Sequence, residues 1–262
     1  RQCYQISHMS AASFGLWRDR QSGALLDEVE RLSENLSSFH KEQFEVAGRT
    51  PRLVGVLNVT PDSFSDGGDN ICHKQAVRRA LEMIQSGAVI IDVGGESTRP
   101  GAKPISSKVE QERVLPVIEA LLQEGVPLSI DTYHPDTMQA AAALGVTMLN
   151  DVTGFAAYPD SLRVAAASGR ILVLVHSAPM AISTGHEFDG GVAIEIFDTL
   201  YQRLQIMEQQ GVPRTNIIID PGLGFEKSQD SNLKALRWLS LFHGLGCQVM
   251  LGASRKFGHL GK

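Results

Sequence analysis

The chain has 262 residues, of which 43% are hydrophobic and 20% are charged, and its formal net charge is -5. A chain of this length can bury one large core. The slightly acidic balance leaves no basic footprint, which excludes nucleic acid as the expected partner. No apolar run approaches the ~18 residues that cross a bilayer, so we expect no membrane association. The three cysteines are widely spaced and fit no zinc pattern, which favours reduced thiols and a cytoplasmic location, with an organelle as the alternative.

The first fifty residues differ from the rest. Leu25, Val29, Leu32, Leu36 and Phe39 recur at spacings of four and three, which predicts an amphipathic helix over about residues 24–44. We therefore interpret residues 1–50 as an N-terminal extension and residues 51–262 as the main domain. The pattern leaves three roles open for the helix: packing on the main domain, connecting it to an upstream domain, or binding a partner.

From residue 52 onward, apolar runs alternate with helical patterns. The runs expected to form strands are Leu53–Leu57, Val89–Val93, Leu128–Asp131, Thr147–Asn150, Ile171–His176, Ile217–Asp220 and Val249–Gly252. The helices expected between them are Lys74–Ser86, Lys108–Gln123, Pro135–Ala143, Asp160–Ala167, Val192–Gln210 and Ser231–Phe242. Glycines that favour a left-handed C-cap follow five of these helices, at Gly87, Gly125, Gly145, Gly169 and Gly211.

This alternation predicts the fold class. Strands that are buried on both faces and alternate with helices indicate a parallel sheet. Because the chain lacks a Gly-x-Gly-x-x-Gly phosphate loop, the repeat favours an α/β fold of the (β/α)8 TIM-barrel type over a Rossmann fold. The eighth strand and helix are not represented in this chain, so we expect the full protein to continue past Lys262.

Polar side chains follow the expected strands, where a barrel of this type builds its site. A single Asp at a strand end more often caps a helix or forms a turn. Several carboxylates and carboxamides at one barrel mouth instead predict a ligand site, because an unpaired buried polar group costs about 1–3 kcal/mol. The segments at the strand ends begin at Asn58, Asp92, Asp131, Asn150, His176, Asp220 and Ser254.

The residue types narrow the chemistry of that site. Side-by-side Asp and Asn groups suit a flat heterocycle with amide-like edges, such as a pterin or a purine. Arg99 in a Ser-Thr-Arg-Pro-Gly loop, together with Arg255 and Lys256, favours an anion of the phosphate type. Asn58 is a hard oxygen ligand that can hold Mg²⁺ against that anion. His176 lacks a second His or Cys for zinc, and we expect it to form hydrogen bonds in the pocket.

Six motifs, in order along the strand ends, resemble the dihydropteroate synthase family over about residues 52–256. They are Asn58–Gly68, Gly94–Gly101, Ser129–Thr132, Leu149–Asp151, Asp220–Phe225 and Ser254–Lys256. The resemblance implies a TIM barrel that condenses 6-hydroxymethyl-7,8-dihydropterin pyrophosphate with p-aminobenzoate, through an S_N1-like step with Mg²⁺. It also implies a role in folate biosynthesis, inhibition by sulfonamides and a homodimer.

The resemblance further implies roles for particular residues. The residues that would bind the pterin are Asp131, Asn150, Asp220 and Lys256, and the catalytic residues among them are Asp131, Asp220 and Lys256. The pyrophosphate would contact Thr98, Arg99 and Asp66, and Asn58 would help to bind Mg²⁺. The aminobenzoate pocket would be formed by Phe64, Pro100, Phe225 and Ser254.

The chain departs from the family pattern in several places, among them the residue after Lys256 and the segment after His176, and two other functions stay open. It also lacks the eighth strand that carries an Arg and a His, and Val175 stands where Met is usual. An inactive pterin-binding barrel would explain the missing eighth strand. A pterin-dependent methyltransferase domain would share the pterin pocket, but it would not need the first loop or the Ser-Arg-Lys motif.

Overall fold

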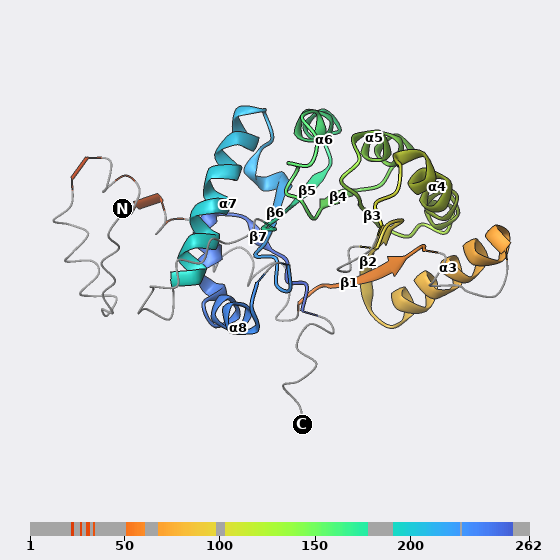
Figure 1. The fold of residues 1–262 in the computed structure, drawn as a ribbon, viewed down its shortest axis with the longest axis horizontal. Helices are drawn as coiled ribbons and strands as arrows, with labels where there is room; N and C mark the ends of the chain where they lie inside the picture. The colour runs from red at the N-terminus through yellow and green to blue at the C-terminus, as the bar shows by residue number, and fades with distance from the viewer. Residues whose placement is uncertain are drawn as a thin grey trace, which may run out of the picture.

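The computed structural model describes residues 22–23, 27, 30–31, 34, 51–60, 68–97, 103–177, 191–225 and 227–253, without the side chains of residues 68–71. Seven strands form one parallel sheet in the order β1 to β7, and a helix lies between each pair of consecutive strands (Figure 1). The strands are β1 (Leu53–Asn58), β2 (Ala88–Gly94), β3 (Leu128–Asp131), β4 (Met148–Asp151), β5 (Ile171–Val175), β6 (Ile217–Asp220) and β7 (Gln248–Val249).

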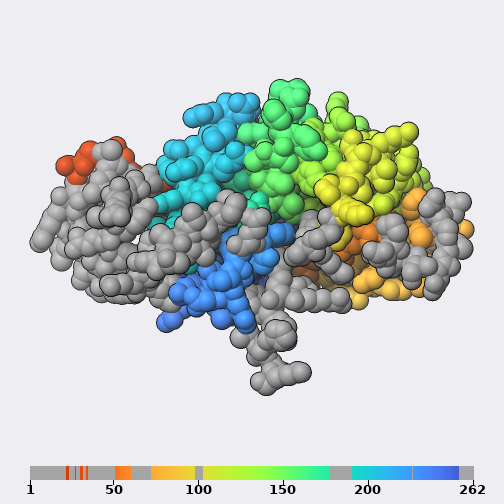
Figure 2. All heavy atoms as spheres, in the orientation of Figure 1, coloured from red at the N-terminus to blue at the C-terminus, as the bar shows by residue number. Residues whose placement is uncertain are grey.

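Six α-helices of the described chain connect these strands. They are α3 (Gly68–Gln85), α4 (Ser107–Gln123), α5 (Pro135–Leu144), α6 (Ser161–Ala167), α7 (Gly191–Gln209) and α8 (Gln229–Arg237). Figure 1 shows the strands curled into an arch with these helices along its outer side, and Figure 2 shows the same succession on the surface. Within the described residues no pairing joins β1 to β7, so the sheet is a curled half-barrel of the TIM type.

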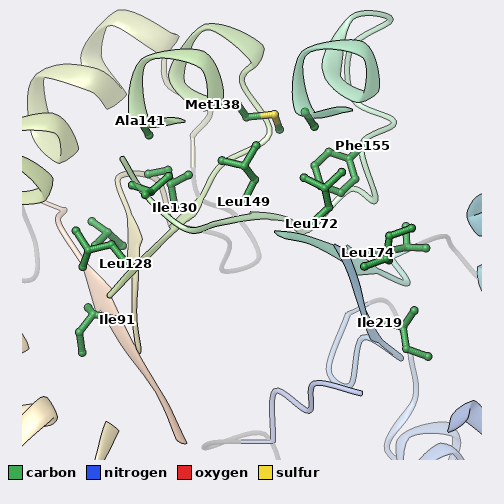
Figure 3. Close-up of a cluster of buried hydrophobic side chains, with 14 of the residues drawn as sticks. Ile91, Leu128, Ile130, Met138, Ala141, Leu149, Phe155, Leu172, Leu174 and Ile219 are labelled. Atoms are coloured by element: carbon green, nitrogen blue, oxygen red, sulfur yellow. The ribbon is translucent and has the colours of Figure 1, made fainter. Parts of the chain in front are cut away.

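The outer face of the sheet forms the larger core. Apolar side chains of the strands, among them Ile130, Leu149 and Leu172, meet helix side chains such as Met138 of α5 (Figure 3). Each of these four is fully buried. Since burying such a side chain stabilises a fold by about 1.5–3 kcal/mol, this contact fixes the strands against the helices.

The inner face carries a second, smaller cluster. Its buried members are Met148, Val173 and Val175, with Phe225 packed against them. These residues alternate along β4 and β5 with those of the outer core, as the period of two along a strand requires. The inner face is therefore apolar in its middle layer and polar at the carboxyl ends of the strands.

All the predicted strands and helices of the main domain are observed, but some bounds differ. Helix α3 begins at Gly68 and not at the predicted Lys74, and β7 covers Gln248–Val249 and not Val249–Gly252. The five glycines expected to cap helices all have positive φ, between 63° and 114°. The prediction of one helix over Ser231–Phe242 is wrong: α8 ends at Arg237, and a 3-10 helix follows over Leu239–Leu245. This second segment contains Ser, Phe, His and Gly, which favour the α-helix less than the Lys, Ala, Leu and Arg of α8 do.

Little of the N-terminal extension is described. Asp27, Glu30, Arg31 and Glu34 are helical, and the Arg31 guanidinium lies 4.8 Å from the centre of the Tyr201 ring of α7. The five apolar residues of the predicted helix lie outside the described residues, so the division at residue 50 stays a prediction. In the part of the chain that the structure describes, no helix is long and apolar enough to cross a membrane.

Candidate active site

Strand register brings polar residues into one row at the carboxyl edge of the sheet. Asn58 pairs with Gly94, Gly94 with Asp131, and Asp131 with Asn150. A Cβ atom placed on Gly94 would lie 3.6 Å from Asn58 Oδ1 and 3.7 Å from Asp131 Oδ2. The glycine therefore leaves a space at the edge with an amide oxygen on one side and a carboxylate on the other.

Below this row, Asp92 of β2 joins Asn150 of β4. Asn150 Nδ2 donates to Asp92 Oδ2 at 2.8 Å, and both residues are buried. Burial raises the pKa of Asp92 above its ordinary value, and its contacts with Ser129 and Asn150 only partly offset this. Among the described residues, neither Asp92 Oδ1 nor Asn150 Oδ1 has a hydrogen-bond partner. Because Ser129 also lies against Asp92, the amide oxygen of Asn150 is the buried acceptor that is ready to receive an N–H group from a ligand.

The next residue along β4 points to the opposite face. Asp151 is fully buried and accepts hydrogen bonds from Thr153 N and Oγ1, both at 2.7 Å, and from Phe155 N at 3.1 Å. Phe155 has φ 59°, which a side chain other than Gly seldom adopts, and its ring packs in the outer core. Burial raises the pKa of Asp151 to about 6, against the opposing effect of these hydrogen bonds. Asp151 is therefore the turn former that a strand-end Asp often is.

On β6, Asp220 begins a tight loop. Its Oδ1 accepts from Gly222 N at 2.7 Å, and Gly224 N donates to Asn232 Oδ1 of α8 at 2.8 Å. Phe225 follows in the same loop and packs against the inner apolar cluster beneath the polar row. The loop thus places one carboxylate and one aromatic ring on the inner side of the sheet.

The ends of β5 and β6 also share a lysine. Lys227 Nζ donates to the carbonyl oxygens of His176, Gly222 and Phe225 at 3.1, 2.9 and 3.3 Å. Burial, and then the charge of Lys227, lowers the pKa of His176 to about 4, so its imidazole is neutral at pH 7. The described residues contain no group of three or more His, Cys, Asp or Glu side chains that could hold a metal ion.

A second polar network lies at the β2–α4 connection, where Thr98, Arg99 and Pro100 are outside the described residues. Glu96 Oε1 accepts from Tyr133 Oη at 2.8 Å, and Glu96 Oε2 accepts from Ile105 N at 3.3 Å. His134 Nε2 lies 3.7 Å from Glu96 Oε2. Arg113 Nη1 donates to Gly95 O at 2.9 Å. These contacts hold the backbone on both sides of the connection.

The chain is similar in sequence to known proteins. The family of pterin binding enzymes matches residues 54–259. The dihydropteroate synthase of Bacillus subtilis is 42% identical over 205 residues, which cover 78% of this chain and 70% of that protein.

The chain belongs to the dihydropteroate synthase family.

Solved structures of the dihydropteroate synthase family share the fold. The Xanthomonas albilineans dihydropteroate synthase with 4-aminobenzoic acid is 39% identical, with a TM-score of 0.73 over 81% of this chain and 77% of that one. The Yersinia pestis dihydropteroate synthase in a sulfonamide drug complex is 36% identical, with a TM-score of 0.70 over 78% of this chain and 75% of that one. The TIM-barrel assignment is therefore confirmed.

The structure brings together part of the site that the family resemblance implies. Asn58, Asp131, Asn150 and Asp220 all lie at the carboxyl ends of their strands, and Phe225 lies on the same inner side. The other predicted site residues lie outside the described residues: Phe64, Asp66, Thr98, Arg99, Pro100, Ser254 and Lys256. The roles of all these residues stay predictions.

Sequence reasoning missed two residues that the structure connects to the predicted site. The sequence places Asp92 at a strand end and assigns it no role. The signal that could have found it is a carboxylate between Ile91 and Val93 in a buried run, because a buried charge needs a partner. Lys227 was missed entirely, because its partners are backbone carbonyl groups, and these leave no pattern in side-chain types.

Proposed function

We propose that this chain catalyses the reaction of its family, in which 6-hydroxymethyl-7,8-dihydropterin pyrophosphate and p-aminobenzoate form 7,8-dihydropteroate and pyrophosphate. One observation carries the proposal: the buried Asn150 Oδ1 has no hydrogen-bond partner within the described residues, and Asn150 stands at the end of the row that runs from Asn58 through Asp131. A pterin presents N–H groups along one edge, and one of these would supply the missing donor.

In this proposal, the pterin lies against the inner edge of the sheet. Asp131, Asn150 and Asp220 bind its ring, together with Lys256, as the resemblance implies. Asp92 acts through Asn150, because its hydrogen bond fixes the orientation of the Asn150 amide and leaves the amide oxygen turned to the ligand. The apolar layer below, with Val173 and Val175, forms the floor under the flat ring.

The pyrophosphate would lie toward the first two loops. Thr98, Arg99 and Asp66 are proposed to contact it, as the resemblance implies. The edge near Gly94 fits Mg²⁺, because Asn58 Oδ1 is a hard oxygen atom there and the substrate and water would supply the other ligands. Asn58 would hold the ion, which when bound supplies positive charge against the leaving pyrophosphate.

The reaction breaks the bond between the pterin methylene carbon and the pyrophosphate oxygen and forms a bond to the arylamine nitrogen. The electron pair of the broken bond leaves with pyrophosphate, and the methylene carbon gains cationic character. Asp131 and Asp220 stabilise that charge through the ring. The arylamine is neutral at pH 7 and needs no strong base, so its proton is lost to solvent after attack. His176, whose imidazole is neutral at pH 7, is not needed as an acid or a base in this step.

Phe225 is proposed to form the aminobenzoate pocket together with Phe64, Pro100 and Ser254. The Xanthomonas albilineans relative holds 4-aminobenzoic acid and the Yersinia pestis relative holds a sulfonamide drug. We infer that both kinds of molecule bind here in the same pocket and compete. A homodimer and a cytoplasmic location are also proposed. The location rests on the two cysteines of the described chain, Cys72 and Cys247, which are both free thiols.

The test is turnover by the purified chain with both substrates, with and without Mg²⁺. We expect dihydropteroate and pyrophosphate in equal amounts, with a rate that depends on Mg²⁺. Pterin binding without any product would instead place the chain among inactive pterin-binding barrels. Transfer of a methyl group from a reduced pterin would favour the methyltransferase function.

A further inference from the structure

Lys227 makes an unusual set of contacts for a lysine in a loop. Its ammonium group has three N–H donors, and three carbonyl oxygens lie within 3.3 Å of Nζ. One carbonyl belongs to His176, directly after β5, and the other two belong to Gly222 and Phe225, in the loop after β6. One side chain therefore joins two neighbouring strand ends.

The two strand ends approach each other very closely at this point. Gly222 has φ 68°, and a Cβ atom on it would overlap the carbonyl oxygen of His176. His176 N also donates to Asp220 O at 2.9 Å, which extends the β5–β6 pairing by one residue. The carbonyl groups of His176 and Gly222 thus lie close together. The Lys227 ammonium group donates to both oxygens and so stabilises this close approach.

The far end of the loop is held by α8. Asn232 Oδ1 accepts from Gly224 N, and Asn232 Nδ2 donates to Lys227 O at 3.2 Å and to Ser228 O at 2.9 Å. These hydrogen bonds hold the loop backbone at Gly224 and at Lys227 and Ser228. Phe225 lies between the two points, and it packs against the inner cluster that contains Val175.

The same loop carries two groups with different proposed substrates. Asp220, proposed for the pterin, is fixed within β6 and by its bond to Gly222 N. Phe225, proposed for the aminobenzoate, lies outside the strand, and Lys227 Nζ binds its carbonyl oxygen. Loss of the ammonium group would therefore disturb Phe225 more than Asp220.

We propose that Lys227 is a positioning residue for the second substrate: it holds the backbone of Phe225 against the end of β5 and so sets the aminobenzoate pocket. Lys227 acts through Phe225 and not on the substrate. This inference rests on the proposed function, because it assigns Phe225 to the aminobenzoate pocket. It adds a residue that the family motif in residues 220–225 does not include.

The test compares Lys227→Met with the unaltered chain in two independent measurements. Steady-state kinetics should show the KM for p-aminobenzoate raised about fivefold or more, and the KM for the pterin pyrophosphate changed less than about twofold. NMR titration of the His176 ring should show a higher pKa, because the positive charge that disfavours its protonation is gone. The second measurement needs no turnover, so it tests the Lys227 contact even if the proposed function fails.

The matched control is Lys234→Met, which removes a lysine of α8 that pairs with Asp230 at 2.7 Å. It should leave both KM values and the His176 titration unchanged. If Lys227→Met does not fold, Lys227→Gln replaces it, since the amide keeps N–H donors and removes the charge. The inference is overturned if a folded Lys227 variant keeps the unaltered KM for p-aminobenzoate, or raises both KM values equally.

Discussion

The two halves of the sheet use their polar groups in different ways. In the half from β1 to β4, Asp92 and Asn150 bind each other and leave one buried oxygen each without a partner in the described chain. In the half from β5 to β7, the described hydrogen bonds at the strand ends go to the protein's own backbone: Asp220 accepts from Gly222 N, and Lys227 donates to three carbonyl groups. The first half leaves an acceptor for a ligand, and the second fixes the loop that carries Asp220 and Phe225, the two residues of this half that are proposed to contact the substrates.

The difference teaches that a polar residue at a strand end has no fixed role. Asn150 and Asp151 are neighbours in β4, yet one faces the inner side with an unpaired oxygen and the other binds its own turn. The face of the sheet on which the side chain lies decides the role of the residue, because successive side chains of a strand point to opposite sides. Substitutions on each face and in each half of the sheet test this division.

Asn150→Ala should impair use of the pterin substrate, which the β1–β4 half is proposed to bind. It removes the amide oxygen proposed for the pterin and leaves the buried Asp92 carboxyl without its donor. We expect kcat/KM for the pterin pyrophosphate to fall by at least about 100-fold, equivalent to about 2.7 kcal/mol. Steady-state kinetics measure this. Asp151→Asn is the control from the opposite face, and a comparable loss of kcat/KM in that variant would contradict the division.

Asp151 should instead affect stability, and in a direction set by its pKa. The folded pKa of about 6 lies above the ordinary value of 3.8, so the folded protein holds this proton more tightly than the unfolded chain does. The resulting stabilisation is fully present below pH 3.8 and is lost as the pH rises to about 6. Relative to Asp151→Asn, the unaltered chain should lose on the order of 2 kcal/mol of unfolding free energy across that window.

Denaturant unfolding of both proteins between pH 4 and 7 measures the effect. The free energies of unfolding of the two proteins should approach or cross with rising pH. Curves that stay parallel would show that Asp151 does not hold its proton in the folded state.

The sequence predicted the strands and the polar strand-end residues of both halves, but not which of these residues bind each other and which bind the backbone. Alternating apolar runs and helical patterns gave the strands, and the strand ends gave Asn58, Asp131, Asn150 and Asp220 as a group. The pattern could not show that Asp92 binds Asn150, because this hydrogen bond joins residues 58 positions apart. Contacts to backbone carbonyl groups, such as those of Lys227, likewise depend on how closely two loops approach.

Phe225→Leu should affect only the second substrate. The smaller side chain keeps the backbone contact with Lys227 but removes the aromatic surface proposed for p-aminobenzoate. We expect the KM for p-aminobenzoate and the inhibition constant of sulfamethoxazole to rise together by about tenfold, equivalent to about 1.4 kcal/mol. Inhibition kinetics at fixed pterin pyrophosphate test this. If only one of the two constants rises, the two molecules do not share this pocket.

Asn58 should give the smallest effect, through the metal. Asn58→Ala should raise the Mg²⁺ concentration for half-maximal activity about threefold, because only one of several oxygen ligands is lost. Asn58→Asp keeps a hard oxygen at the same place and should not raise it. A titration of activity with Mg²⁺ distinguishes the three proteins, and identical curves would remove Asn58 from the metal site.

The central claim is that the unpaired amide oxygen of Asn150, in the β1–β4 half, binds a pterin. The most direct measurement is isothermal titration of the unaltered chain, Asn150→Ala and Asp151→Asn with 6-hydroxymethylpterin monophosphate. The account predicts binding of one molecule per chain by the unaltered protein and by Asp151→Asn, and no detectable binding by Asn150→Ala. Equal binding by the unaltered protein and a folded Asn150→Ala variant would contradict it.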